Sequence, residues 1–144
     1  MSKDHSEGYA RKHPGSSGPD ETVASVLKEK CKDGRISCAA AHGVAGTLAK
    51  TPAEIGIALD LVEIRLTKCQ MGLFGYTPDK RIVKKAEQWP SSLEKDIQAS
   101  LVEGRLACAD AWRIAKQHDL TRPAVANVCE ALGIKIKPCQ LGAF

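Results

Sequence analysis

Apolar residues recur at helical spacing near the start of the chain. Four of them form one predicted helical face: Val23, Val26, Leu27 and Cys31. Asp20 precedes this face as a candidate N-cap, and Gly34 follows it as a stop, because glycine adopts the left-handed conformation that ends many helices. A second face begins after Ser37 and predicts a second helix. It consists of Ala41, Val44, Ala45 and Leu48.

A third helix has the sharpest predicted start. The stretch TPAE places Thr51 at the N-cap, Pro52 at the first helical position and Glu54 at the third, which is the pattern of a capping box. The apolar residues that follow face inward in this helix: Ile55, Ala58, Leu59 and Val62. The short stretches GRIS (34–37) and EIRL (63–66) predict extended segments.

The chain repeats itself at an offset of 70 residues, as the stretches TKCQMGLFGY and KPCQLGAF indicate. Twelve residues between positions 34 and 74 meet an identical residue without a gap. They are Gly34, Arg35, Cys38, Ala39, Ala41, Ala45, Thr51, Ile64, Cys69, Gln70, Gly72 and Phe74. Such self-similarity at a fixed period indicates an internal duplication.

The second copy predicts the same order of elements. A helix is expected from Ser91 with Glu94 at its start, a second over 108–118 and a third over 122–132. Gly133 ends the third helix, and IKIK (134–137) alternates like a strand. The predicted fold class is therefore mainly α, with short β-strands.

These patterns divide the chain of 144 residues into four parts. We expect a flexible polar tail (1–19), a first repeat (20–76), a basic linker (77–90) and a second repeat (91–144). A repeat of about 55 residues buries little core alone, so we expect the repeats to pack on each other or on a partner chain, such as a second copy. The absence of an apolar leader or membrane-length run predicts a cytoplasmic protein.

The order helix, short strand, helix, tight turn, helix, strand is that of a winged helix-turn-helix unit. Each repeat therefore resembles that family, over residues 20–76 and 91–144, and the duplicated CQLG pattern resembles a bacterial family with that motif. The resemblance implies DNA binding and transcription regulation. It places the third helix of each repeat, starting at Pro52 and Arg122, in the major groove of a duplex.

The charges favour the second repeat as the DNA-reading one. The chain carries a net charge of +4, but the third helix of the first repeat presents Glu54 and Asp60 outward. Base edges and phosphates need cationic or amide donors. The candidate donors of the second repeat are Arg113, Lys116, Gln117, Arg122 and Asn127. The linker adds Lys80, Arg81, Lys84 and Lys85 as candidate backbone contacts, although a solvated charged linker needs no ligand.

The duplication sorts the six cysteines into two groups. Cys31 and Cys129 align with leucines of the other repeat, which indicates core residues. Four others occupy matched positions: Cys38, Cys69, Cys108 and Cys139. Each pair is expected to lie close together, with thiols of lowered pKa, either as packing residues or as ligands of a metal or Fe–S cluster. His42 is a candidate third ligand in the first repeat, whereas Trp112 occupies the matching place in the second.

The CQ-x-G stretch is expected to end the last strand of each repeat, with Phe74 and Phe144 closing the core. No motif for a cofactor or nucleophile is present, so we expect no enzyme. Three functions remain open. They are a DNA-binding regulator, a protein-interaction or assembly module on a helix-turn-helix scaffold, and a thiol-based metal or redox sensor. The exposed small residues expected at Ala39, Ala40, Gly43 and Gly46 favour the second of these.

Overall fold

The computed structural model describes residues 21–78 and 80–143, which form two compact units that divide between Thr67 and Lys68. Both units are mainly helical with a few short strands, as the sequence predicts. Asp20, the candidate N-cap, lies outside the described residues, as do Phe144 and the tail. The boundary differs from the expected one, since residues 68–76 belong to unit 2.

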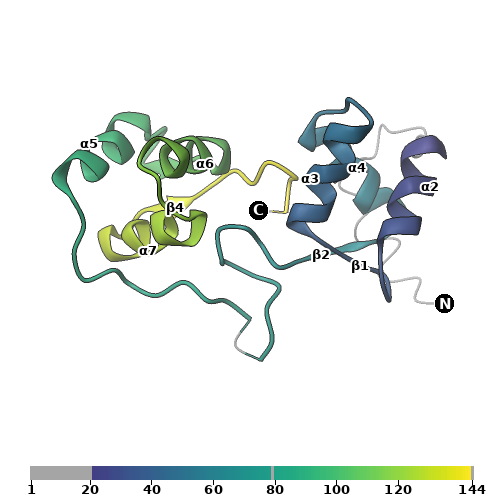
Figure 1. Cartoon of the computed structure of the whole chain (residues 1–144), viewed down its shortest axis with the longest axis horizontal. Coiled ribbons are helices and arrows are strands. Elements are labelled where there is room, and N and C mark those ends of the chain that lie inside the picture. The colour runs from purple at the N-terminus through teal and green to yellow at the C-terminus, as the bar shows by residue number, and fades with distance from the viewer. Residues whose placement is uncertain (1–20, 79, 144) are drawn as a thin grey trace. The chain divides into compact units, whose positions relative to one another are not determined.

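Unit 1 contains three helices and two strands among its described residues (Figure 1). In chain order they are α2 (Glu21–Lys30), β1 (Arg35–Ser37), α3 (Cys38–Thr47), α4 (Pro52–Val62) and β2 (Arg65–Thr67). Their buried apolar residues include Leu27 from α2, Val44 from α3 and Leu59 from α4. The three helices therefore share one small core.

The helix starts of unit 1 follow the predicted caps. The hydroxyl of Ser37 accepts the backbone N–H of Ala40 at 3.1 Å, which starts α3. Thr51 and Glu54 form the predicted capping box at the start of α4. The connection between α3 and α4 contains Ala49 at a φ of 54°, a left-handed conformation that costs a residue with a side chain about 1–2 kcal/mol.

Unit 2 repeats the same elements 70 residues later. They are α5 (Ser91–Ser100), β3 (Arg105–Leu106), α6 (Cys108–Gln117), α7 (Arg122–Leu132) and β4 (Lys135–Ile136). Thr121 caps α7, and Gly133 ends it at a φ of 70°, both as predicted. Helix α5 begins at Ser91 with Glu94 in its first turn, as expected, although no side chain caps it. Pro90 is its N-cap without a side-chain bond, and Glu94 instead accepts the indole N–H of Trp89 at 2.8 Å.

The two strands of each unit pair in parallel. Arg35 lies opposite Arg65, and Arg105 lies opposite Lys135. A tight turn precedes each first strand. In unit 1, Asp33 and Gly34 both have positive φ, and Lys32 and Arg35 exchange two backbone hydrogen bonds. That is the geometry of a type I′ turn, so Gly34 serves this turn rather than the end of α2 at Lys30.

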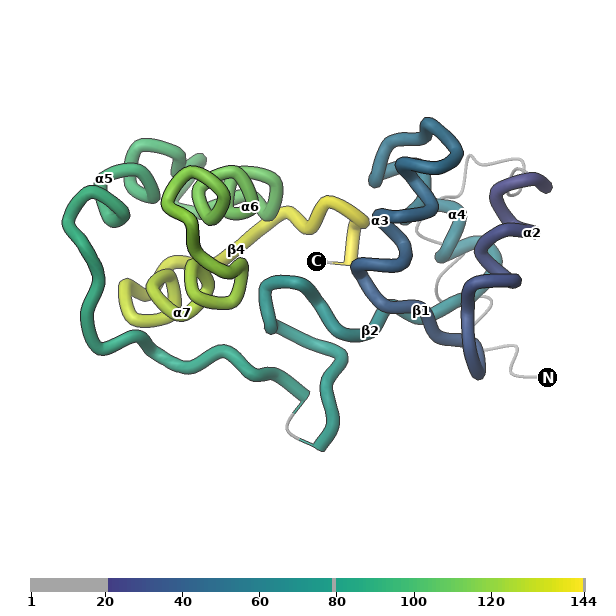
Figure 2. The backbone as a smooth tube through the Cα atoms, in the orientation of Figure 1, coloured from purple at the N-terminus to yellow at the C-terminus, as the bar shows by residue number. Residues whose placement is uncertain are grey.

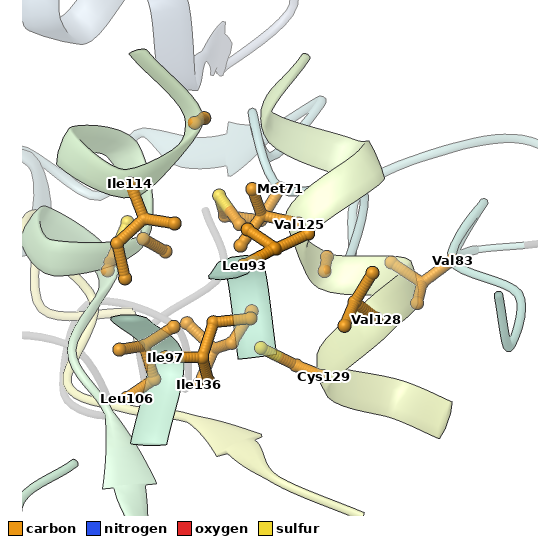
Figure 3. Packing of buried hydrophobic residues seen from close by; sticks show 14 of the residues in the cluster. Met71, Val83, Leu93, Ile97, Leu106, Ile114, Val125, Val128, Cys129 and Ile136 are labelled. Atoms are coloured by element: carbon orange, nitrogen blue, oxygen red, sulfur yellow. The ribbon is translucent and has the colours of Figure 1, made fainter. Parts of the chain in front are cut away.

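Residues 68–90 form an irregular segment that Figure 2 follows from the end of β2 to the start of α5. Three of its side chains are buried in the core of unit 2: Cys69, Met71 and Val83. Figure 3 shows Val83 beside Val128 of α7, and Met71 among the residues that α5, α6 and α7 contribute. The segment 77–90 is therefore partly core rather than a solvated linker.

Candidate functional site

The second helix of the α6–α7 pair was the predicted DNA-reading element, and another part of the chain lies along it. We call residues 81–86 the covering segment. The side-chain oxygen of Asn127 accepts the backbone N–H of Lys84 at 2.9 Å, and the carbonyl of Asn127 accepts that of Ala86 at 3.0 Å. Arg81 forms a 3.0 Å salt bridge with Glu130. Val83, between these contacts, is 8% exposed.

Arg122, the first residue of α7, is held by two other side chains of unit 2. Its guanidinium lies 3.5 Å from the centre of the Trp112 ring of α6. It also donates a 3.0 Å hydrogen bond to the side-chain oxygen of Gln70. Arg122 and Asn127 were the two strongest candidates for base reading, and both make contacts inside unit 2.

The remaining candidate cations are Arg113 and four lysines. Arg113 donates to Ser100 at 2.8 Å and to Gln117 at 3.1 Å, and it lies 3.6 Å from Asp110. Arg113 is itself exposed, as are the side chains of Lys80, Lys84, Lys85 and Lys116. Because these lysines come from separate segments, the predicted donors do not form one continuous row along α7.

The second repeat brings its matched cysteines together, at the start of α6. The backbone N–H of Cys108 donates to the carbonyl of Pro138 at 3.0 Å, and the side-chain amide of Gln140 donates to the Cys108 sulfur at 3.5 Å. Cys139 lies between these two partners in sequence. Residues 138–140 therefore lie directly against the first turn of α6.

The thiol of Cys108 does not have the lowered pKa expected at a helix start. Burial raises the pKa of Cys108 above its ordinary value, and the thiols of Cys139 and Cys69 raise it further. The hydrogen bond from Gln140 offsets part of that rise. Burial also raises the pKa of Cys129 to about 11, as expected for a core thiol. The helix dipole is thus outweighed by desolvation at Cys108.

All six cysteines are free thiols. Cys38 is buried at the first position of α3 in unit 1, and His42 lies one turn further along that helix. Among the residues that the structure describes, no cluster of three or more His, Cys, Asp or Glu side chains has the placement needed for a metal ion. Four of the thiols are buried, those of Cys38, Cys69, Cys108 and Cys129, and the other two are half-buried.

The repeated CQ-x-G stretch is a turn in both copies. The backbone N–H of Gly72 donates to the carbonyl of Cys69 at 2.9 Å, and Gly142 donates to Cys139 at 3.1 Å. The residue between Gln and Gly is buried in each copy, as Met71 or Leu141. Ile82 donates its backbone N–H to the carbonyl of Gly72 at 2.9 Å, so the first turn also positions the covering segment.

Two glycines on α3 have no packing reason among the residues that the structure describes. Gly43 and Gly46 are exposed in the middle and last turn of the helix, and a Cβ added to either meets no atom within 4 Å. Exposed glycine in a helix costs about 0.5–1 kcal/mol relative to alanine. The small face expected on α3 is therefore present, and Ala39 and the half-buried Ala40 extend it.

Sequence patterns did not reveal two of the contacts in unit 2. Gln70 was noticed as a repeated residue, but its bond to Arg122 spans 52 positions. His118 at the end of α6 bonds to Asp96 of α5, again across a long separation.

This chain was compared with protein-family models, curated proteins and solved structures, and none of them matches it.

None of the described helices has the length and apolar character that a bilayer span requires.

Proposed function

We propose that this chain is a protein-interaction module that holds extended peptide segments across the second helix of each helix-turn-helix pair. The observation that carries the proposal is the covering segment on α7. It contributes a buried apolar side chain, an ion pair and two backbone N–H groups, which is how extended peptides are recognised. In unit 2 the bound segment comes from the chain itself.

The same contacts make α7 a poor reader of duplex DNA. A recognition helix places its own side chains against base edges in the major groove. Here the face of α7 around Asn127 and Glu130 is occupied, and Arg122 stacks on Trp112. The winged helix-turn-helix family would also add an antiparallel hairpin, whereas the described strands of both units pair in parallel.

Unit 1 supplies a matching face for an external segment. At the offset of 70 residues, Asp60 of α4 corresponds to Glu130, which pairs with Arg81. Ile57 corresponds to Asn127 and is 38% exposed. The α4 face thus has an acid, Asp60, at the position that receives a cation in unit 2. Beside this acid it has an apolar side chain where unit 2 has an amide. A segment that presents an apolar side chain to Ile57 fits this chemistry.

A peptide with the sequence of the covering segment tests the proposal directly. We expect a labelled peptide KRIVKKAE, residues 80–87 of this chain, to bind the full chain saturably in fluorescence anisotropy. Ile57→Lys should weaken that binding at least tenfold, because it places a cation on the apolar part of the α4 face. Ser25→Lys adds the same charge at an exposed position of α2 and should leave the affinity unchanged. Equal affinities of these two variants would refute the proposed face.

A salt titration of binding to a random-sequence duplex separates this function from the DNA-binding alternative. Binding that neutralises several phosphates weakens steeply with salt, whereas a peptide-binding module without a phosphate-contacting row should show weak binding and a shallow slope. Tight duplex binding that weakens steeply with salt would support a DNA-binding regulator instead.

A further inference from the structure

Unit 2 contains a groove that neither the covering segment nor the cysteine turns explain. Its volume is about 630 Å³, within the range of small-molecule sites in proteins. The second half of α7, residues 133–137 with strand β4, and the side chains of Leu73, Phe74, Arg81 and Ala143 form its walls. All of these elements belong to unit 2.

The inner surface of the groove is apolar. Ala126 and Cys129 of α7 are 1% exposed, and Ile136 of β4 is 7% exposed. Figure 3 shows the side chains of Cys129 and Ile136 close together in the core. Phe74 and Ile134 line the groove from either side as partly buried residues. Burial keeps the Cys129 thiol neutral at physiological pH, since its pKa is raised to about 11.

The rim of the groove carries an excess of positive charge. Arg81 and Glu130 both line it, and their 3.0 Å salt bridge neutralises one charge of each sign. Lys135 and Lys137 also line it, and both are exposed. Lys135 is the first residue of β4 and Lys137 directly follows the strand, so they flank buried Ile136 in sequence. Neither forms an ion pair with any residue of the described ranges 21–78 and 80–143.

We infer that this groove binds an amphipathic anion, with an apolar body against Cys129 and Ile136 and an anionic head between Lys135 and Lys137. The apolar wall favours a hydrocarbon body, and the unpaired lysines favour a carboxylate or sulfonate over a cation. The acid on the rim does not oppose this choice, because Arg81 already neutralises Glu130. The groove shares the Arg81–Glu130 pair with the covering segment, but it takes a small molecule and does not depend on the peptide-binding function proposed above.

Two ligands of equal length and opposite charge test the inference. The fluorescent apolar sulfonate 8-anilinonaphthalene-1-sulfonate is first titrated into the full chain, and we expect saturable binding at one site. Decanoate should then displace this probe at a concentration at least tenfold lower than decylamine does. Equal displacement by the two ligands, or probe binding that does not saturate, would overturn the site.

Lysine variants assign the anionic head to the rim. The double variant Lys135→Ala and Lys137→Ala should weaken decanoate binding at least tenfold. The matched control, Lys95→Ala and Lys116→Ala, removes the same charge from exposed helical positions of unit 2 and should change it less than twofold. Circular dichroism checks that both variants keep the helical content of the parent chain. A control that loses as much affinity as the rim variant would show a general charge effect and contradict the assignment.

Discussion

The guanidinium of Arg122 lies 3.5 Å from the centre of the Trp112 ring and donates to Gln70 at 3.0 Å. This arrangement joins the first turn of α7, the middle of α6 and the repeated CQ-x-G turn. A cation over an indole ring is worth about 0.5–2 kcal/mol, depending on how far it is desolvated. Arg122 is therefore a structural residue of unit 2, in a position where a recognition helix would begin.

Replacing Arg122 by alanine should lower the free energy of unfolding by roughly 1–3 kcal/mol, because both the ring contact and the charged hydrogen bond are lost. Urea titration followed by tryptophan fluorescence measures this change. A double-mutant cycle with Gln70→Ala should give a coupling energy of at least about 0.5 kcal/mol. Lys116→Ala, on the exposed face of α6, is the control and should stay within about 0.5 kcal/mol. Additive effects at Arg122 and Gln70 would contradict this account.

Alanine at Gly43 or Gly46 should stabilise the chain. Each position accepts a Cβ without any contact within 4 Å, so the helix gains about 0.5–1 kcal/mol per substitution. Thermal unfolding compares these variants with Ala39→Gly, which makes the reverse change on the same helix and should destabilise it by a similar amount. Destabilisation by Gly43→Ala would reveal a close packing partner for α3. If Gly43→Ala or Gly46→Ala stabilises the chain but abolishes binding of the peptide, the peptide-binding face lies on α3.

Gly72 and Gly142 hold equivalent places but should respond differently to alanine. Both have positive φ, so each substitution costs about 1 kcal/mol of backbone strain. A Cβ at Gly72 would additionally lie 2.7 Å from Cγ1 of Ile82 and 3.3 Å from Cγ2 of Val83, whereas Gly142 has open space. Gly72→Ala should therefore cost about 1–2 kcal/mol more than Gly142→Ala in urea titration. Equal costs would mean that the first turn does not pack against the covering segment.

Stability should fall between pH 9 and pH 11 because of Cys129. Its folded-state pKa of about 11 lies above the ordinary value of 9.0, so its contribution is complete below pH 9 and is lost as the pH rises through 11. The loss should amount to roughly 1–3 kcal/mol. Cys129→Ala removes this thiol. The difference in unfolding free energy between the parent chain and this variant should therefore become smaller from pH 9 to pH 11. A difference that stays constant would show that the thiol is not desolvated.

The local parts of the fold could be predicted because their causes are local. Thr51 with Glu54, Ser37 and Gly133 act within one helical turn, and the offset of 70 residues transferred each element to the second copy. The parallel pairing could not be predicted, since two or three residues per strand carry no signal of direction. The covering segment was not predicted because Val83 is its only buried side chain. One apolar residue produces no periodic pattern in the sequence.

The candidate site was harder to predict for the same physical reason. Arg122 and Asn127 have the side chains of DNA-reading residues, and nothing nearby in sequence shows that Trp112, Gln70 and Lys84 engage them. Cys108 occupies a helix start, as predicted, but its pKa depends on burial, which the three-dimensional core determines. The sequence located these residues on their helices. Their burial and their long-range partners, which determine their pKa and their hydrogen bonds, depend on the folded structure.

Hydrogen exchange at the backbone amides of Lys84 and Ala86 tests most directly whether α7 is covered. These N–H groups bond to the side chain and carbonyl of Asn127, so both should exchange at least tenfold more slowly than the amide of Lys85 between them. In Asn127→Ala, the protection of Lys84 should fall to the level of Lys85. Exchange of Lys84 and Ala86 at unprotected rates in the parent chain would mean that α7 is open to a duplex, and it would contradict the proposed module.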